Sequence, residues 1–288
     1  MSLKILICSD APDSFSGYSV EVRQFAPAIA ELGHDVALLA TFGHHGAVRS
    51  WRPRHWPEGR SLRVYPGGMD AFANDAIGPA ARDWQADIVI TLKDIHVFRP
   101  ETFNGLRWIP MVPCDHEPAP PAVIQLSRMC YRPIAYAPNG FRELRKAGLD
   151  PLYCPHSFDP AVTYPMDRTE ARAKLGVPDD VFLIGIVAVN RGGIPSRKAW
   201  AQNLEGAALF LKQHRDAFLF LHTYLCEDGR EGGVNIRALI AQLSEIHHHD
   251  FAQQILFCDQ QRYIDGFPDS DLTLLYNAID VLDAVSLG

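Results

Sequence analysis

The stretch 181–198, VFLIGIVAVNRGGIPSRK, decides the fold of the second half of the chain. Its apolar run, 182–189, is rich in branched residues, which is typical of a strand buried on both faces of a parallel sheet. Glycine and proline then end the strand in the loop 190–196. Arg197 and Lys198 follow at the start of a predicted helix, where backbone N–H groups and cationic side chains favour an anion. We hypothesise that this loop holds the diphosphate of a nucleotide-linked substrate.

The beginning of the chain predicts a β-α-β unit, which specifies a parallel sheet. A strand at 4–8 is followed by helical spacing of apolar residues over 22–32, with Gly33 as the predicted C-cap, and by a second strand at 36–40. Gly17 lies where the first strand passes into the helix, so its missing Cβ would let a phosphate approach the backbone. A structural turn glycine is the equally weighted alternative. The dinucleotide fingerprint G-x-G-x-x-G is absent from the sequence.

The same alternation of strands and helices continues to the end of the chain. Strands are predicted at 62–65, 87–91, 108–112, 134–137, 152–156, 217–224, 255–258 and 278–285, and helices at 141–147, 170–175, 199–213, 234–246 and 272–277. Thr169 is the predicted N-cap of the helix 170–175.

A proline-rich segment with little periodicity divides the pattern into two halves. The sequence therefore predicts a Rossmann-like N-terminal domain at 1–160, a linker at 161–180 and a second Rossmann-like, nucleotide-sugar-binding domain at 181–288. A buried strand close to the end of the sequence predicts that the second domain is incomplete there.

The loop 113–118, PCDHEP, is the densest polar cluster of the first half. Asp115, His116 and Glu117 would stand at the carboxyl end of a parallel strand, where open α/β sheets bind ligands. Histidine is suited to proton transfer or hydrogen bonding near neutral pH. Solvated loop residues are the alternative, and a metal site is disfavoured because consecutive loop residues rarely ligate one ion.

Composition narrows the function classes. The 288 residues carry a net charge of −7 with a pI near 5.9, which argues against nucleic acid as a partner. No apolar run is long enough to span a bilayer, so we expect a soluble, cytoplasmic protein that could at most contact a membrane peripherally. The six cysteines form no metal-finger spacing and are expected to be small buried hydrophobes, and the run 247–250, HHHD, is expected to be a polar helix end.

Several segments, in order along the chain, resemble the GT-B fold and specifically the retaining glycosyltransferases of family 4. They are LGHDV at 32–36, YCPHSFD at 153–159, LGVP at 175–178, RK at 197–198 and LYNAIDV at 275–281. The resemblance covers nearly the whole chain and implies two Rossmann-like domains facing a cleft. The family's next motifs, an E-G-F-G loop and a Glu-x7-Glu pair, would follow residue 288, so the resemblance also implies a truncation.

The resemblance assigns roles to the candidate residues. Gly17 would face the donor diphosphate from the first domain, and Asn190 or Arg191 would stand in place of the family's Gly-Arg pair. Arg197 and Lys198 look like the family's R-K, whose lysine contacts the diphosphate.

His116, next to Asp115, looks like the family's active-site histidine, here in a positioning or hydrogen-bonding role. No cofactor and no metal are implied.

The implied reaction moves a sugar from a nucleoside-diphosphate sugar to a hydroxyl of a glycan, lipid or small-molecule acceptor, with retention. A non-catalytic nucleotide-sugar or polysaccharide-binding module is the alternative function. A nicotinamide-dependent oxidoreductase is disfavoured because the G-x-G-x-x-G motif is missing.

Overall fold

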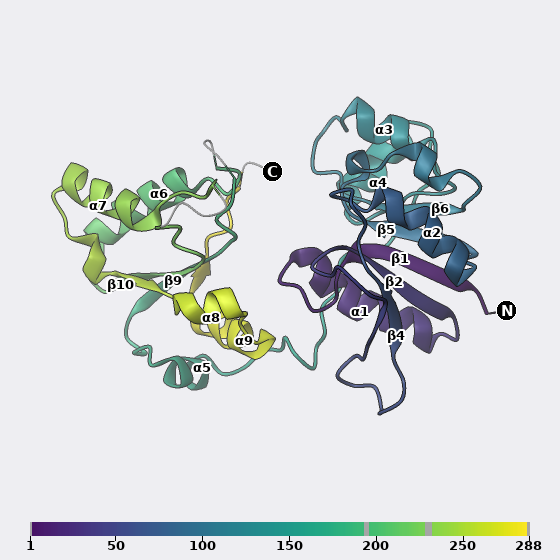
Figure 1. Cartoon of the computed structure of the whole chain (residues 1–288). Coiled ribbons are helices and arrows are strands. Elements are labelled where there is room, and N and C mark those ends of the chain that lie inside the picture. Colours follow the sequence, from purple (N-terminus) through teal and green to yellow (C-terminus); the bar gives the residue numbers. More distant parts are fainter. Residues whose placement is uncertain (1, 193–195, 228–231, 287–288) are drawn as a thin grey trace. The chain divides into compact units, whose positions relative to one another are not determined.

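A computed structural model describes residues 2–192, 196–227 and 232–286, and its contacts divide the chain into two compact units, 1–158 and 159–288 (Figure 1). Each unit is an α/β structure with its own sheet and its own hydrophobic core. Part of the 190–196 loop, residues 193–195, and the last two residues of the chain lie outside the described residues.

The sheet of the first unit has eight strands. They are β1 (Lys4–Asp10), β2 (Asp35–Phe42), β3 (Arg49–Trp51), β4 (Leu62–Tyr65), β5 (Ile88–Leu92), β6 (Trp108–Val112), β7 (Ile134–Ala135) and β8 (Leu152–Tyr153). Their order is β3-β4-β2-β1-β5-β6-β7-β8, and every neighbouring pair is parallel except β3 with β4. The predicted parallel sheet is therefore confirmed, with β1 at its centre.

Helices cover both faces of this sheet (Figure 1). They are α1 (Gly17–Glu31), α2 (Asn74–Trp84), α3 (Pro121–Ser127) and α4 (Pro138–Lys146), with two short 3-10 turns, η1 (Ile95–Val97) and η2 (Pro100–Phe103). Val22 and Ala26 of α1 pack with Ile5 and Ile7 on one face of β1. Apolar side chains of α2, α3 and both 3-10 turns pack with Leu6 on the other face. Because β1 is covered on both faces, its continuous apolar run is explained.

The second unit repeats the plan with a smaller sheet. Its strands are β9 (Phe182–Val187), β10 (Ala217–His222), β11 (Ile255–Phe257) and β12 (Val281–Leu282), all parallel in the order β11-β10-β9-β12. Its helices are α5 (Arg168–Leu175), α6 (Trp200–Gln213), α7 (Ile236–His247), η4 (Phe251–Gln253), α8 (Gln260–Asp265) and α9 (Asp269–Ala278). Side chains of α6 and α7 cover one face, and Ile279 packs close to Gly185 on the other.

Three predicted boundaries are wrong, each for a local reason. Gly33 follows the helix C-cap, Leu32, and takes the left-handed conformation (φ +91°) of a residue one position beyond the cap. Asp167, and not Thr169, caps α5, because its side chain accepts a hydrogen bond from the backbone N–H of Glu170. The predicted final strand 278–285 shrinks to β12, since α9 extends to Ala278.

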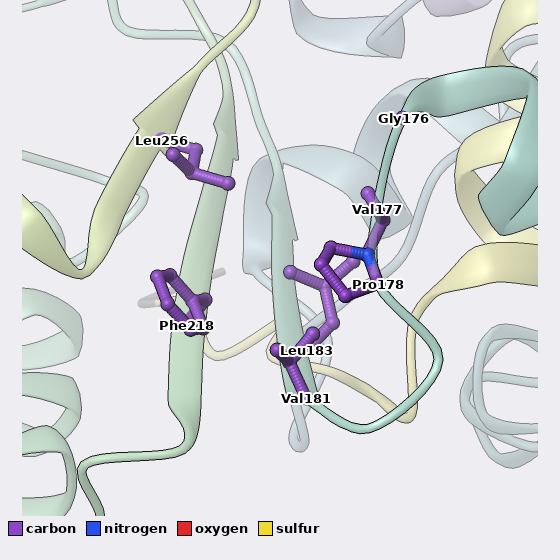
Figure 2. A pocket seen from close by; sticks show the side chains of 7 residues that line it. All are labelled: Gly176, Val177, Pro178, Val181, Leu183, Phe218 and Leu256. Atoms are coloured by element: carbon purple, nitrogen blue, oxygen red, sulfur yellow. The ribbon is translucent and has the colours of Figure 1, made fainter.

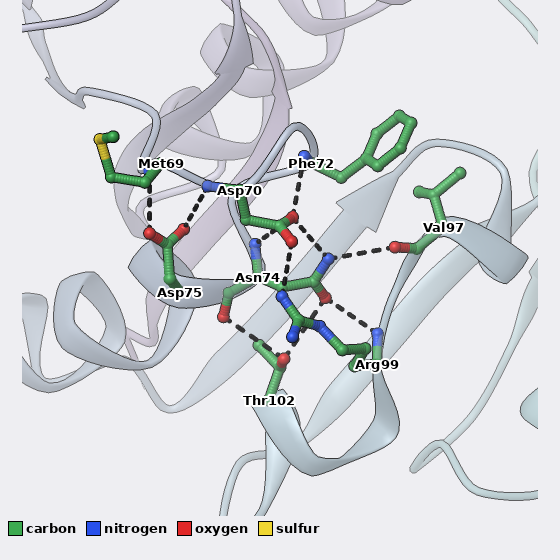
Figure 3. Close-up of polar contacts among 8 residues, drawn as sticks. All are labelled: Met69, Asp70, Phe72, Asn74, Asp75, Val97, Arg99 and Thr102. Atoms are coloured by element: carbon green, nitrogen blue, oxygen red, sulfur yellow. Dashed lines mark hydrogen bonds and ion pairs between the residues drawn. The ribbon is translucent and has the colours of Figure 1, made fainter.

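Helix α2, which sequence patterning did not predict, starts from a polar cluster on the loop after β4 (Figure 3). The carboxylate of Asp70 accepts hydrogen bonds from the backbone N–H groups of Phe72 and Asn74 and pairs with Arg99 at 2.5 Å. The side chain of Asn74 donates to Asp70 and to the Val97 carbonyl. These contacts lower the pKa of Asp70 to about 2, with the Asn74 side-chain hydrogen bond as the largest cause.

The segment 159–180, much of which was predicted to be a linker, carries a buried arginine. Arg172 of α5 is fully buried and donates to the backbone carbonyls of four residues, 178, 179, 181 and 278. Its guanidinium also pairs with Asp280 at 2.6 Å, and Asp280 accepts from the backbone N–H of Leu183. These contacts attach α5 to the second unit.

Candidate functional site

The two sheets share a topological feature that marks ligand sites in open α/β folds. In the first sheet the chain leaves β1 toward β2 and later returns to β5 on its other side, so the strand order reverses between β1 and β5. In the second sheet it reverses between β9 and β12. Ligands bind outside the carboxyl ends of strands at such switch points. A ligand site is therefore expected at the loops that follow β1, β5 and β9.

Gly17 is the first residue of α1, at the switch point of the first sheet. Ser16 caps the helix by accepting a hydrogen bond from the backbone N–H of Ser19. A Cβ added at Gly17 would meet no heavy atom within 4 Å, and its φ lies outside the left-handed region. Neither packing nor backbone conformation within this unit requires glycine there, which favours the ligand interpretation over the turn-glycine alternative.

A buried ion pair that sequence reasoning missed lies beside Gly17. Asp10 is the last residue of β1, and the Lys93 ammonium lies 2.6 Å from its carboxylate. Asp10 also accepts hydrogen bonds from the hydroxyls of Ser16 (2.6 Å) and Thr41 (3.2 Å). The sequence signal was available, because Asp10 ends one apolar strand and Lys93 follows another, but nothing in the sequence paired them.

The structure places Asp115 and His116 in contact at the carboxyl end of β6. The Nδ1 atom of His116 lies 2.7 Å from the Asp115 carboxylate, and both side chains are more than half exposed. A carboxylate on one ring nitrogen orients the imidazole and fixes its tautomer. No hydrogen bond joins the Nε2 atom of His116 to the part of the chain that the structure describes. The pair is therefore oriented and exposed, as a group that contacts a substrate must be.

Helix α4 holds the 113–119 loop in place. Glu143 is buried and accepts a hydrogen bond from the backbone N–H of Ala119 at 3.0 Å. Lys146 bridges Glu143 and Glu117. Glu117 therefore has a partner on α4, whereas His116 and Asp115 pair with each other.

In the second unit, Arg197 and Lys198 lie directly before α6, in the segment that follows β9. No side chain within the described ranges caps α6 at its N-cap residue, Ala199. The pKa of Lys198 is lowered, first by partial burial and second by the positive charge of Arg197. A cation that is partly desolvated and beside another cation is stabilised by an anionic partner.

Asn190 is buried, and its side chain binds backbone. Its amide nitrogen donates to the carbonyls of Tyr224 (2.9 Å) and Val234 (2.7 Å), and its oxygen accepts from the Val234 N–H (2.9 Å). Gly233 must be glycine for this arrangement, because a Cβ there would lie 2.7 Å from the Asn190 carbonyl. Asn190 therefore clamps two loops together, and its predicted contact with the donor stays a prediction. Arg191, the next residue, is exposed.

Asn203 of α6 also joins loops at this edge and was not predicted. Its side-chain amide donates to the carbonyls of Lys198 and Val285, both at 3.0 Å. The segment that carries Lys198 and the segment after β12 are thereby joined at the switch point of the second sheet.

A hollow elsewhere in the second unit is unsuited to a charged ligand. It measures about 170 Å³ and is lined by apolar side chains, among them Leu183, Phe218 and Leu256 (Figure 2). Leu183 and Phe218 lie near the starts of their strands, away from the carboxyl edge. The hollow offers no polar group for a diphosphate.

Other sequence-based expectations fall on structural features. His248 ends α7 in the left-handed conformation, as a polar helix end predicts, but His249 is buried and bound to Gln254. Within the described ranges there is no group of three metal-ligating side chains, and no helix is long and apolar enough to cross a membrane. Four of the six cysteines are buried and the other two are partly buried, and none of them forms a disulfide within the described residues.

The chain matches no protein-family profile and no curated protein. It does match solved structures over nearly its whole length. Sucrose-phosphate synthase from Thermosynechococcus elongatus superposes with a TM-score of 0.70 and 16% identity, over 98% of this chain and 75% of that one. The Anabaena Alr3699/HepE protein, in complex with UDP and glucose, gives 0.57 and 14% over 99% and 74%. The catalytic domain of Arabidopsis thaliana starch synthase IV, bound to ADP and acarbose, gives 0.59 and 10% over 100% and 79%.

These matches establish the fold. The chain has the GT-B fold, with two Rossmann-like parallel-sheet units, as the sequence predicted. GT-B glycosyltransferases are among the structures that it matches, as is a putative UDP-N-acetylglucosamine 2-epimerase from Listeria monocytogenes. Since the identities are at most 16%, activity and substrates must be argued from the residues themselves.

Proposed function

We propose that this chain is a retaining glycosyltransferase of GT-B family 4, which transfers a sugar from a nucleoside-diphosphate sugar to a hydroxyl of a glycan, lipid or small-molecule acceptor. One observation carries the proposal: Arg197 and Lys198 lie at the switch point of the second sheet, before a helix N-terminus that no described side chain caps. The fold around them is one in which other proteins have been solved with UDP or ADP bound.

In the proposed reaction the sugar–phosphate bond breaks and negative charge develops on the leaving diphosphate. Lys198 and Arg197, with Arg191 close by in sequence, neutralise that charge, and backbone N–H groups at the start of α6 add hydrogen bonds. In the first unit, Gly17 leaves the backbone at the start of α1 open to a phosphate. We propose that side chains and backbone do this work without a metal ion.

The acceptor hydroxyl attacks the anomeric carbon from the face on which the leaving group departs and gives its proton to the departing phosphate. The new glycosidic bond forms on that same face, so the configuration is retained. His116, oriented by Asp115 at 2.7 Å, positions the transferred sugar by hydrogen bonding. This role needs an exposed, oriented ring and no nucleophilic carboxylate.

Calorimetric titration with UDP, GDP and ADP tests the donor site. At least one nucleotide should bind, and Lys198→Ala should weaken its affinity by about 10- to 100-fold, because a charge-assisted hydrogen bond contributes about 1.5–3 kcal/mol. Lys212→Ala is the matched control, since Lys212 lies at the other end of α6 and donates to the His247 carbonyl. The proposal fails if none of the three nucleotides binds, or if the two variants lose the same affinity.

Transfer itself needs a second measurement. Incubation with nucleoside-diphosphate sugars and a panel of glycan, lipid and small-molecule acceptors should release the nucleoside diphosphate and form a glycoside of unchanged anomeric configuration. Nucleotide binding with no turnover of any donor would instead identify a non-catalytic nucleotide-sugar-binding module.

A further inference from the structure

The ion pair between Asp10 and Lys93 lies at the switch point of the first sheet, and the proposed reaction does not use it. The side chain of Asp10 is 3% exposed and that of Lys93 is 13% exposed. Burying a carboxylate and an ammonium costs several kcal/mol per ion unless each is paired and hydrogen-bonded. This pair meets the condition, because the Asp10 carboxylate accepts from Lys93, Ser16 and Thr41.

The two charges hold the residues on either side of Gly17. The Asp10 carboxylate accepts from the hydroxyl of Ser16, the residue before Gly17. The Lys93 ammonium lies 4.5 Å from the ring centroid of Tyr18, the residue after Gly17, in a cation–π contact. The pair therefore fixes the first turn of α1 from both flanks, while the space beside Gly17 stays open.

The pairing also decides the sign of the local charge. A helix N-terminus attracts an anion through its partial positive charge, and a carboxylate close to it would repel that anion. Lys93 cancels the charge of Asp10. Other charged groups nearby include Asp94, which accepts from the Tyr18 hydroxyl at 3.3 Å, Asp13, which is paired with Arg49, and Glu21, which is paired with His156.

We propose that Asp10 and Lys93 are positioning residues for the diphosphate: Asp10 holds the α1 N-terminus in place, and Lys93 neutralises Asp10 so that this N-terminus can accept an anion. The inference rests on the proposed function, because it takes the diphosphate to bind beside Gly17.

The test is a charge cycle read by calorimetric titration with whichever of UDP, GDP or ADP the wild-type chain binds. Lys93→Met leaves an uncompensated carboxylate, and we expect at least about tenfold weaker binding, because its charge repels the anion at an effective dielectric constant well below that of water. Asp10→Asn removes the repelling charge and keeps an acceptor for Ser16, so we expect binding no weaker than that of the wild type. The double variant Asp10→Asn/Lys93→Met should bind the nucleotide with an affinity within about twofold of the wild type, because removing both charges restores the charge balance.

Lys4→Met is the matched control, because Lys4 is the first residue of β1, at the opposite end of the strand from Asp10, and donates to Gln85. A purely structural pair would behave differently: both single variants would weaken binding and the double variant would not recover. That outcome, or an unchanged affinity in Lys93→Met, overturns the inference. If Lys93→Met does not fold, as thermal unfolding would show, Asp10→Asn and the double variant still decide, since weakened binding in both contradicts charge compensation. Failure of the wild-type chain to bind any nucleotide would count against the proposed function instead.

Discussion

The carboxyl edges of the two sheets are built in opposite ways. In the first unit the buried charges are paired within the protein, with Asp10 and Lys93 2.6 Å apart. In the second unit the buried polar groups include the neutral amide of Asn190, which binds backbone, and the cation Lys198 is partly buried beside a second cation. The first edge is electrostatically complete without a ligand, whereas Lys198 of the second edge is better stabilised with an anion present.

This difference suggests a division of labour. A cation that is destabilised by desolvation and like charge gains most when an anion arrives, so the second edge should supply affinity. An edge whose charges are already satisfied can hold a substrate in one geometry, so the first edge should supply orientation and chemistry. The following predictions test that division of roles between the two edges.

The largest effect is expected at His116. His116→Ala should lower the turnover number by at least about 100-fold, the range in which positioned histidines act, and leave the nucleotide dissociation constant unchanged within about twofold. Steady-state kinetics and calorimetry on the same preparation measure both. His55→Ala is the matched control, because His55 is also an exposed histidine of the first unit, 3.0 Å from the carboxylate of Glu31. Unchanged turnover in His116→Ala would return this residue to the solvated-loop interpretation.

An intermediate effect is expected at Asn190. Asn190→Ala removes three hydrogen bonds to backbone and should cost about 3 kcal/mol of folding free energy, which lowers the melting temperature of the second unit by about 10 °C. Thermal unfolding monitored by circular dichroism measures this shift.

Asn277→Ala controls for lost stability as such. The Asn277 amide makes the same kinds of contact, with the backbone of Met166, Tyr164 and Thr273, on α9. If Asn190→Ala weakens nucleotide binding more than Asn277→Ala does, Asn190 also contacts the donor. Equal affinities would show that Asn190 acts only as a clamp, and the second edge would then rely on its cations.

The sequence predicted the parallel sheets well because buried parallel strands leave a continuous apolar run, as in 4–8 and 182–189. It predicted that Gly17, His116 and Lys198 lie after the carboxyl ends of strands, because each is in the segment that follows such an apolar run: β1 for Gly17, β6 for His116 and β9 for Lys198. It could not predict the Asp10–Lys93 pair, since those residues are 83 positions apart and only the order of strands brings them together. The burial of Arg172 could not be predicted for a related reason. A short, amphipathic-looking helix in a proline-rich stretch does not show that its arginine is fully buried against backbone carbonyls.

The smallest effects are expected from pH, and they should fall in different windows for the two units. Burial lowers the pKa of His222, on β10, below its usual value. A histidine with a lowered folded-state pKa binds fewer protons folded than unfolded, so its unit loses stability as pH falls below about 6.5. Asp70, in the first unit, has a pKa of about 2, so its stabilising contribution is full above about pH 4 and is lost as pH falls toward 2.

Two variants separate these windows, with unfolding followed by denaturant titration between pH 8 and pH 2. The gap in stability between wild type and His222→Gln should shift in favour of the variant as pH falls from 7 to 5, because glutamine does not titrate. The gap between wild type and Asp70→Asn should stay constant down to about pH 4 and then close. A His222→Gln gap that does not change with pH would mean that burial does not shift the pKa of this ring in the folded state. Desolvation is also the first cause of the lowered pKa of Lys198. If desolvation had no effect at His222, the contrast between the two edges would weaken.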